Sequence, residues 1–461
     1  MEQTLVFDQA LIEKYDAAGP RYTSYPTAPQ FHEGFGEAEY RAAAQATNAS
    51  GRPLSLYFHI PFCDTVCFYC ACNKIATKDR AMPAPYLQRV HKELEMQGAL
   101  FDRSRQVEQL HWGGGTPTFI SHAEMAELMA ATRRHFSLLD DDSGEYSIEI
   151  DPREATAEGI ALLRRLGFNR MSLGVQDFDE RVQRAVNRIQ SEEQTLAVLH
   201  AARNQGFRSI SIDLMYGLPL QTRDSFRRTL ERIIAAGPDR LSVFNYAHLP
   251  ERFKPQRRID PAELPAPQEK LEILKMTSER LAEAGYVYIG MDHFARPDDE
   301  MAVAQRDGTL YRNFQGYSTH ANCDLIGIGV TSIGMVGDTY SQNARELEHY
   351  YQRIDAGRLP VFRGYQLSHD DRLRRDVITR LICHFDLDLK GVEERWGVKF
   401  ADYFAPELAK LQGMAADELV ALEPGRIDVM PKGRLLIRNI CMVFDQYLAT
   451  RAEPVKFSRV I

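Results

Sequence analysis

Six short apolar runs rich in β-forming residues recur between residues 54 and 246, with helical segments between them. This alternation is typical of βα units, in which the strands form a parallel sheet and the helices cover it. Several of the helices end in a glycine just before the next strand, at Gly167, Gly206 and Gly285, where a left-handed helix cap is expected. The sequence therefore predicts an α/β fold. The predicted strands are Leu54–Pro61, Val107–Gly113, Tyr146–Ile150, Arg170–Val175, Ser209–Leu214 and Leu241–Tyr246, followed later by Val287–Met291.

Polar residues and glycines gather where each of these strands ends. For a single strand, turn residues would explain such a segment equally well, but six segments in series favour one common edge of a sheet. In α/β barrels that edge carries the active site. We therefore expect a partial barrel of the TIM type, (β/α)6, with its site at the carboxyl ends of the strands. The six segments include, in chain order, Cys63, Gly113, Asp151, Gln176, Asp213 and Ala247.

Charge and hydropathy exclude several other classes of protein. The 461 residues carry 56 basic and 64 acidic side chains, so the net charge of −8 provides no overall field for nucleic acid or acidic lipid. No apolar run approaches the roughly 20 residues of a membrane span. The first residues lack the basic and apolar regions of a signal peptide, and we expect a cytoplasmic protein. Without a heptad pattern or a broad apolar stripe, a monomer is the default.

The two ends of the chain differ in pattern from its centre. Gly19–Thr27 is too interrupted for a helix and too aromatic for a disordered tail, so we expect an extended segment over the active site. The last region is mainly helical, with a hairpin predicted over Val420–Val429 and a helix over Leu435–Leu448. This order is compatible with a winged helix. Its basic residues alternate with acidic ones, however, which favours a structural or lid role over nucleic-acid binding. The three predicted regions are the N-terminal segment (1–36), the catalytic barrel (37–365) and the C-terminal domain (366–461).

Four of the seven cysteines crowd into residues 63–72, and thiolates at such spacings bind a soft metal. A structural zinc site normally has a second ligand pair further along the chain, and a redox dithiol is a further alternative. The C-x3-C-x2-C spacing directly after a strand favours a 4Fe–4S cluster on Cys63, Cys67 and Cys70, with one iron left open. Cys72 could supply a fourth ligand, although one intervening residue makes it hard for Cys70 and Cys72 to occupy adjacent corners. The other cysteines, interpreted as small buried hydrophobic residues, are Cys323, Cys383 and Cys441.

The cysteine triad after one strand, with the glycine run Gly113–Thr116 after the next, resembles the radical S-adenosylmethionine (SAM) enzymes. The resemblance implies that SAM chelates the open iron of the cluster. The glycine run suits the methionine moiety of SAM, because residues without side chains let the backbone approach a ligand closely. Further motifs resemble the oxygen-independent coproporphyrinogen III oxidase family over essentially the whole chain. They are His59–Cys63, Cys72–Lys74, Gly174–Phe178, Asn245–His248, Gly290–Pro297, Asn313–Tyr317 and Phe457–Ile461.

This resemblance implies two SAM molecules and a set of contacts for each. Glu149 and Asp213 could accept hydrogen bonds from ribose hydroxyls, and Arg188 could clamp a carboxylate. Outside the motif context, the two acids could equally cap helices and the arginine could form a surface ion pair. The contacts to the SAM on the cluster would come from Tyr57, Gly114, Glu149 and Ile333. Those to the second SAM would come from Tyr69 (often Phe in the family), Gly115, Thr116, Gln176, Arg188, Asp213 and Ala247.

The reaction that the resemblance implies is oxidative decarboxylation of two propionate side chains of coproporphyrinogen III to vinyl groups, giving protoporphyrinogen IX. A 5′-deoxyadenosyl radical would abstract a β-hydrogen, and the substrate radical would lose CO2 and one electron. A low-potential electron donor is the implied partner. Since the substrate carries four carboxylates, cations are expected near the cluster. The candidates, each of which could also be a plain surface charge, are Arg21, Lys74, Arg296 and Arg312.

Two alternatives remain open at this point. A haem-binding chaperone of the same superfamily would use the cluster without decarboxylating a substrate, but such relatives typically lack Cys72 and the N-terminal Tyr-Pro segment, both present here. A radical SAM methyltransferase can also use two SAM molecules.

Overall fold

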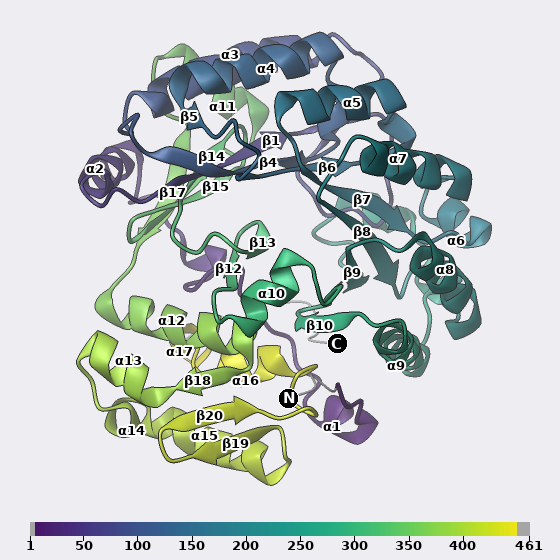
Figure 1. The fold of residues 1–461 in the computed structure, drawn as a ribbon, viewed down its shortest axis with the longest axis vertical. Helices are drawn as coiled ribbons and strands as arrows, with labels where there is room; N and C mark the ends of the chain where they lie inside the picture. Colours follow the sequence, from purple (N-terminus) through teal and green to yellow (C-terminus); the bar gives the residue numbers. More distant parts are fainter. Residues whose placement is uncertain (1–4, 450–461) are drawn as a thin grey trace.

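The structure is a computed structural model that describes residues 5–449. Its centre is a curved sheet in which six strands lie parallel in the order β9-β8-β7-β6-β4-β1, with helices on its outer face (Figure 1). This arrangement confirms the predicted α/β partial barrel of six βα units. The strands are β1 (Leu54–Ile60), β4 (Gln106–Gly114), β6 (Glu145–Ile150), β7 (Arg170–Gln176), β8 (Ser209–Tyr216) and β9 (Arg240–Asn245). The helices are α3 (Pro83–Gly98), α4 (His122–His135), α5 (Ala157–Leu166), α7 (Glu192–Asn204), α8 (Arg223–Ala236) and α9 (Pro267–Glu283).

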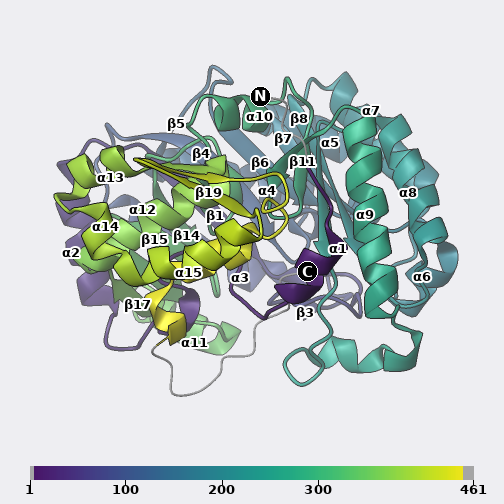
Figure 2. The same cartoon turned by 90° about the horizontal axis from the view of Figure 1, so that it is seen from below.

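Three of the helices end at the glycines that the sequence predicts. Gly167, Gly206 and Gly285 all have positive φ, which confirms the expected left-handed caps. In α9, the polar residue Ser278 is buried on the inner face, where its hydroxyl donates to Leu274 O at 2.9 Å within the helix. Figure 2 shows α8 and α9 side by side along the outside of the barrel. No helix of the described chain is long and apolar enough to cross a membrane.

The sheet continues beyond the six strands on both sides. The predicted strand Val287–Met291 is confirmed as β10, whereas β11 and β14 to β17 were not predicted. Next to β1 it adds β14 in parallel, then β15, β16 and β17 in antiparallel register; next to β9 it adds β11 and β10. Glycines weaken the strand pattern in this part of the sequence. Gly327 cannot be replaced by a residue with a side chain, because a Cβ atom there would lie 2.9 Å from Ile333 O. The added strands are β10 (Val287–Gly290), β11 (His293–Ala295), β14 (Asp324–Ile328), β15 (Ile333–Val336), β16 (Thr339–Asn343) and β17 (Val361–Gln366).

After β17 the chain forms a separate group of helices around a three-stranded sheet, β18-β20-β19. The hairpin predicted over Val420–Val429 is confirmed as β19 and β20. The predicted helix Leu435–Leu448 is wrong: the chain forms two helices, because Asp445 interrupts the first and its carboxylate accepts from Tyr447 N at 2.9 Å. The elements are α12 (His369–His384), β18 (Asp386–Asp388), α13 (Leu389–Trp396), α14 (Phe400–Tyr403), α15 (Ala405–Ala416), β19 (Val420–Glu423), β20 (Arg426–Val429), α16 (Ile437–Val443) and α17 (Gln446–Ala449). The motif Phe457–Ile461 lies outside the described residues.

The N-terminal segment lies against this last group of helices (Figure 1). Asn439 Nδ2 donates to Tyr15 O at 2.7 Å, and Tyr22 Oη donates to Asp445 Oδ2 at 3.0 Å. The segment also contains a short helix, α1, that the sequence analysis did not predict. The division of the chain at residues 36 and 365 stays a prediction. The remaining elements are α1 (Gln9–Lys14), α2 (Glu37–Asn48), β2 (Phe62–Cys63), β3 (Ile75–Ala76), β5 (Ser137–Leu138), α6 (Glu180–Ala185), α10 (Glu300–Arg306), β12 (Tyr311–Asn313), β13 (Gly316–Ser318), α11 (Leu347–Asp355) and five short 3-10 helices between residues 28 and 263.

Two glycines test how tightly the end of β1 is packed. Gly329 has φ +94°, and a Cβ atom there would lie 2.3 Å from Tyr86 Oη and 2.8 Å from His59 O. Gly337 has φ +56°, and a Cβ atom added there would have no neighbouring atom within 4 Å. We expect Gly337→Ala to lower the free energy of unfolding by about 1 kcal/mol through backbone strain alone. Gly329→Ala should lower it by about 3 kcal/mol, because Tyr86 must also move. Thermal unfolding of both apoproteins measures the difference, and equal losses would contradict this packing.

Candidate active site

The cysteine segment begins where β1 ends. Cys63 lies in β2, whose pairing with β3 closes the loop at its base. The loop is also attached to the end of α6, where Phe68 N donates to Val186 O at 2.9 Å. Cys63 and Cys67 are buried and Cys70 is half-buried, whereas Cys72 is exposed. The three predicted iron ligands thus differ from the fourth cysteine in their burial.

Two arginines face the sulfur of Cys67. Nη1 of Arg188 lies 3.5 Å and Nη2 of Arg153 lies 3.6 Å from this Sγ atom. Asp151 holds both guanidinium groups, accepting from Arg153 at 2.7 Å and from Arg188 at 3.0 Å. At the first cysteine, Thr116 Oγ1 donates to Cys63 Sγ at 3.6 Å. Burial raises the pKa of the Cys63 thiol to about 11, and the hydrogen bond from Thr116 opposes this shift.

The other end of the loop has its own charge pattern. A hydrogen bond from Cys72 and the charge of the Lys74 ammonium lower the pKa of Cys70 to about 5, although burial opposes this shift. The same hydrogen bond raises the pKa of Cys72. Lys74 Nζ also donates to Cys70 O at 3.2 Å, so this predicted substrate cation lies in the cysteine loop. The Cys72 thiol therefore acts as a donor beside the triad.

The glycine run at the end of β4 forms a cradle without side chains. Gly114 has φ +116°, and a Cβ atom there would lie 2.7 Å from the ring of His59. A Cβ atom at Gly115 would lie 2.7 Å from Phe62 O. Gly114 N donates to Glu149 Oε2 at 3.0 Å, which joins the cradle to β6. Only glycine fits these two positions, so the backbone here stays open to the close approach of a ligand.

Two rings from neighbouring strands cover the cradle on the inside of the barrel. Tyr57 and His111 are in register on β1 and β4 and stack with ring centroids 5.8 Å apart. Tyr57 Oη lies 3.1 Å from His59 Nδ1, and His111 Nε2 lies 3.4 Å from Glu149 Oε1. Burial alone would raise the pKa of Glu149, but His111 and Gly114 N–H lower it below its usual value, which keeps the carboxylate ionised.

Sequence reasoning gave no role to four residues of this site, His59, His111, Asp151 and Arg153, although His59 and Asp151 lay in segments that it singled out. A signal existed for His59, which is two residues after Tyr57 and therefore on the same face of the strand. His111 comes from a different strand, β4. The pairing of Asp151 with two arginines had no such signal, since Arg188 lies on a different βα unit.

Further around the rim, buried polar atoms lack partners. Oε1 of Gln176 and Nε of Arg188 are buried without a hydrogen-bond partner among the described residues, and Gln176 has φ +69°. Asp213 accepts from Ser172 Oγ at 2.8 Å, and burial raises its pKa to about 6. Buried polar atoms are normally paired, so these orphans indicate where a polar ligand binds.

Two cavities lie in this part of the molecule. One of about 230 Å³ runs along the inside of the barrel, from Arg170, Ser209 and Arg240 at the amino ends of the strands to Glu149 and Asp213. The other, about 650 Å³, lies at the ends of β8 and β9 and is lined by Ala247 and Arg21. Volumes of this size are those of sites for cofactors and small molecules.

The remaining two predicted SAM contacts lie at the edges of this region. Tyr69 is buried, and its carbonyl accepts from Gln256 Nε2 at 3.0 Å. Ile333 opens β15 and packs against Gly327, which is the register partner of Tyr57 on β14.

The predicted substrate cations lie in three places: Lys74 in the cysteine loop, Arg21 and Arg312 together, and Arg296 apart from the others. Arg21 Nη1 pairs with Asp292 Oδ2 at 3.2 Å. Arg312 is 7% exposed and lies over the ring of Tyr317 at 4.7 Å, and its Nε and Nη1 atoms lack hydrogen-bond partners among the described residues. Arg438 joins them: burial and then repulsion from Arg21 and Arg312 lower its pKa to about 10, although Asp292 opposes the shift. We call Arg21, Arg312 and Arg438 the arginine cluster.

Arg296 lies elsewhere. Its backbone N donates to Asp239 O at 2.9 Å, just before β9 begins, and its side chain is half exposed beside Asp298. This residue is therefore at the amino end of the strands, opposite the cysteine loop.

Comparison with known proteins agrees with this geometry. The model of the radical SAM superfamily matches residues 57–233, and that of the HemN C-terminal domain matches residues 367–436. A protein named oxygen-independent coproporphyrinogen III oxidase from Pseudomonas aeruginosa is 56% identical over 461 residues. The match covers 100% of this chain and 100% of that protein. This chain belongs to the oxygen-independent coproporphyrinogen III oxidase family. The family member from Escherichia coli is 52% identical over 459 residues, which cover 100% of this chain and 99% of that protein.

The solved structure of coproporphyrinogen III oxidase from Escherichia coli, described as a radical SAM enzyme, superposes with a TM-score of 0.92. It is 51% identical in sequence, and the match covers 96% of this chain and 100% of the other. The family is one of radical SAM enzymes, so its cofactors are a 4Fe–4S cluster and SAM. The residues present fit both groups. The Cys63, Cys67 and Cys70 thiols, of which Cys67 faces two arginines, form the metal donor set, and the orphaned atoms of Gln176 and Arg188 offer polar contacts to a ligand.

Alanine substitutions separate the cysteine triad from Cys72. Cys67→Ala removes the thiol between the two arginines and should abolish most iron and sulfide binding after anaerobic reconstitution. Cys72→Ala removes only an exposed thiol and should keep the full iron content and the electron paramagnetic resonance signal of the cluster. Equal loss of iron in the two variants would make Cys72 a cluster ligand and contradict the triad.

Proposed function

We propose that this protein converts two propionate side chains of coproporphyrinogen III to vinyl groups without oxygen, giving protoporphyrinogen IX for haem biosynthesis. The observation that carries the proposal is the convergence of the thiol triad, the glycine cradle and the cavity of about 650 Å³ at one rim of the barrel. Membership of the family, at 56% identity over the full length of a relative, supports the same reaction.

When bound, the cluster and SAM supply a 5′-deoxyadenosyl radical, which oxidises the propionate by removing a hydrogen atom from its β-carbon. The protein's own residues bind and orient. Cys63, Cys67 and Cys70 hold the cluster, and the backbone of Gly114 together with Glu149 and Tyr57 receives the SAM beside it. The substrate radical then loses CO2 and passes one electron to a one-electron acceptor, which leaves the vinyl group, so no side chain has to act as a general base.

A second SAM molecule is part of the proposal. Its contacts would be Gln176, Arg188 and Asp213, whose orphaned or protonatable polar atoms lie at the ends of β7 and β8. Arg188 would then contact both the cluster cysteines and the second SAM. One of its Nη atoms faces Cys67, and its Nε atom is free of partners within the described chain. The remaining contacts of this molecule would be Tyr69, Gly115, Thr116 and Ala247.

The arginine cluster is our candidate for the substrate carboxylates. Within residues 5–449, Asp292 pairs with Arg21 and also attracts Arg438, so the cluster combines three guanidinium groups with this carboxylate in a mostly buried place. Arg312 in particular has two buried N–H groups without partners among residues 5–449. A propionate carboxylate would satisfy these donors in the fork geometry that arginine provides.

Arg312→Gln should raise the KM for coproporphyrinogen III about tenfold or more, because a charge-assisted hydrogen bond contributes about 1.5–3 kcal/mol. Cleavage of SAM in the absence of substrate should not change. Arg296→Gln is the matched control, since Arg296 lies at the other end of the strands, and it should leave KM unchanged. A KM that responds to Arg296 and not to Arg312 would remove the arginine cluster from the substrate site.

Anaerobic turnover tests the reaction itself. The reconstituted enzyme receives coproporphyrinogen III, SAM and a low-potential reductant, and mass spectrometry follows 5′-deoxyadenosine and a divinyl product. Both should appear, and both should be absent with Cys67→Ala. Deoxyadenosine without the porphyrin product would mean another substrate, and a methylated product would mean a methyltransferase. Neither product, from protein that holds iron and sulfide and binds haem tightly, would favour the haem-carrier alternative.

The proposal includes a low-potential electron donor as partner, a monomeric enzyme and a cytoplasmic location. Free thiols support the location, since all seven cysteines are unpaired and disulfides are typical of oxidising compartments. Gel filtration of the reconstituted enzyme at several concentrations tests the monomeric state.

A further inference from the structure

A second group of metal-binding side chains lies at the amino end of the strands, opposite the cysteine loop. It consists of Glu108 on β4 and of His320 and Cys323 in the loop before β14. The ligand atoms of all three lie within 4.8 Å of one another. Cys323 is buried, and the side chains of His320 and Glu108 are 21% and 41% exposed, so the group is open to solvent on one side.

The residue types and spacing suit zinc. Zinc binds thiolate sulfur at about 2.3 Å and histidine nitrogen or carboxylate oxygen at about 2.0–2.2 Å in a tetrahedron, which separates a nitrogen and an oxygen ligand by about 3.3 Å. His320 Nδ1 lies 3.4 Å from Glu108 Oε2. The pair His320–Cys323 has the two intervening residues common between zinc ligands. The sequence analysis treated Cys323 as a buried hydrophobic residue, because its partner Glu108 is far away in the chain.

The backbone directs the side chain of Glu108 toward this place. Register between β1 and β4 shifts at this residue: Leu54 pairs with Val107 and Ser55 pairs with Gln109, so Glu108 is the extra residue of a bulge. Bulges re-aim side chains at the rims of barrels. Cys323 lies on the other side of β1, since its neighbour Asp324 is the register partner of Leu54.

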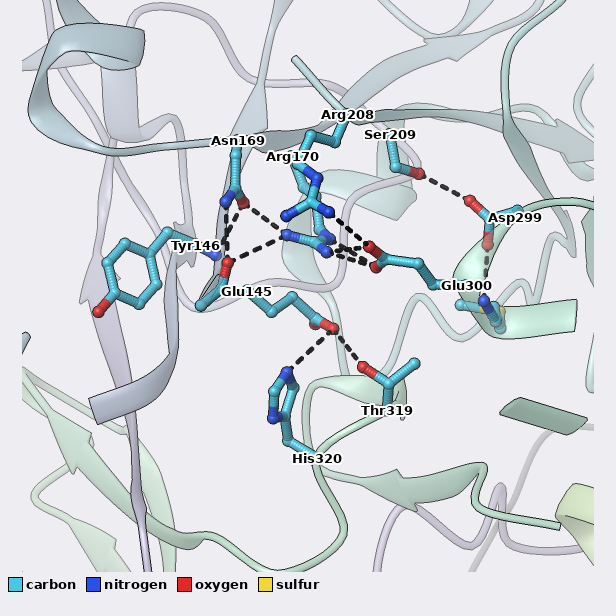
Figure 3. A network of polar contacts seen from close by, with 12 residues as sticks. Glu145, Tyr146, Asn169, Arg170, Arg208, Ser209, Asp299, Glu300, Thr319 and His320 are labelled. Carbon is cyan, nitrogen blue, oxygen red and sulfur yellow. Dashed lines mark hydrogen bonds and ion pairs between the residues drawn. The ribbon is translucent and has the colours of Figure 1, made fainter. Parts of the chain in front are cut away.

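Glu145 is a carboxylate on the far side of the His320 ring, at a distance from the second ring nitrogen that is longer than a hydrogen bond. Its Oε2 atom lies 4.0 Å from Nε2 of His320, the ring nitrogen that points away from Glu108, and accepts from Thr319 Oγ1 at 2.9 Å (Figure 3). Gln109 Nε2 donates to the other oxygen at 2.9 Å. Zinc-binding histidines almost always donate their second N–H to a carboxylate or carbonyl held in this way.

We propose that Glu108, His320 and Cys323 bind Zn²⁺, with Glu145 orienting His320 and a water molecule in the fourth position. The site would tie the loop before β14 to β4 across the start of β1. It is independent of the 4Fe–4S cluster and of the proposed reaction, so it can be present or absent without affecting either conclusion.

The test is metal analysis of the full-length enzyme with its cluster reconstituted anaerobically. The protein is given Zn²⁺, dialysed against a weak chelator, and its zinc and iron are measured separately. We expect about one zinc per chain, lost in His320→Ala and in Cys323→Ala with iron unchanged. Cys383→Ala, which removes a buried thiol elsewhere, should keep its zinc. Glu145→Gln should weaken zinc binding about 10- to 100-fold.

Replacing zinc by Co²⁺ gives a second readout, which in the wild-type enzyme reports the geometry of the site directly. The difference spectrum between the Co²⁺-loaded and Zn²⁺-loaded enzymes removes the absorption of the cluster. It should show the visible bands of tetrahedral Co²⁺ with a sulfur-to-metal band in the near ultraviolet, and the sulfur band should vanish in Cys323→Ser. The proposal is overturned if the wild-type enzyme retains no zinc. It is also overturned if Cys323→Ala and His320→Ala keep their zinc, which would then be bound elsewhere.

Discussion

Six parallel strands that end at one rim are the constraint on which the rest of the molecule depends. Because the carboxyl ends of neighbouring parallel strands lie together, residues that come after different strands meet even when more than a hundred positions separate them in the chain. The pairing of Cys67 with Arg188 at 3.5 Å is the clearest case, and Asp151 on a third βα unit holds that arginine in place. The metal donors, the glycine cradle and the cavity of about 650 Å³ all depend on this one edge.

The opposite end of the barrel is built differently. There, ion pairs and hydrogen bonds link the first residues of the strands: Arg170 pairs with Glu300 of α10, and Arg240 with Asp299 at 2.8 Å (Figure 3). Most of these groups satisfy one another, whereas polar atoms of Gln176 and Arg188 at the catalytic rim stay unpaired within the described chain. Extensive pairing stabilises the amino end, although Arg170, Ser209 and Arg240 also line the cavity inside the barrel. Unpaired polar atoms leave the carboxyl end available to ligands. The proposed zinc site lies at the amino end, where it would add one more cross-link.

The sequence predicts what is local. All six βα strands and the cysteine loop could be derived, because each depends on a short run of residues and on the turn that comes directly after it. The extension β14–β17 could not be, since glycines such as Gly327 hide a strand that tertiary packing requires. The sequence also could not distinguish the positions of two predicted cations. Arg312 joins a buried cluster, whereas Arg296 lies at the amino end of β9. Both lie in motif-rich segments, and only the path of the chain in space separates them.

The central claim is that a propionate side chain of the substrate is oxidised at this rim by hydrogen-atom removal from its β-carbon. Transfer of deuterium tests it most directly. Coproporphyrinogen III carrying deuterium at the β-carbons of the reacting propionates is supplied to the reconstituted enzyme, and the 5′-deoxyadenosine formed is analysed by mass spectrometry. The account predicts that the deoxyadenosine gains deuterium and that the vinyl product loses the same atom. Deoxyadenosine without deuterium, formed together with a divinyl product, would contradict it.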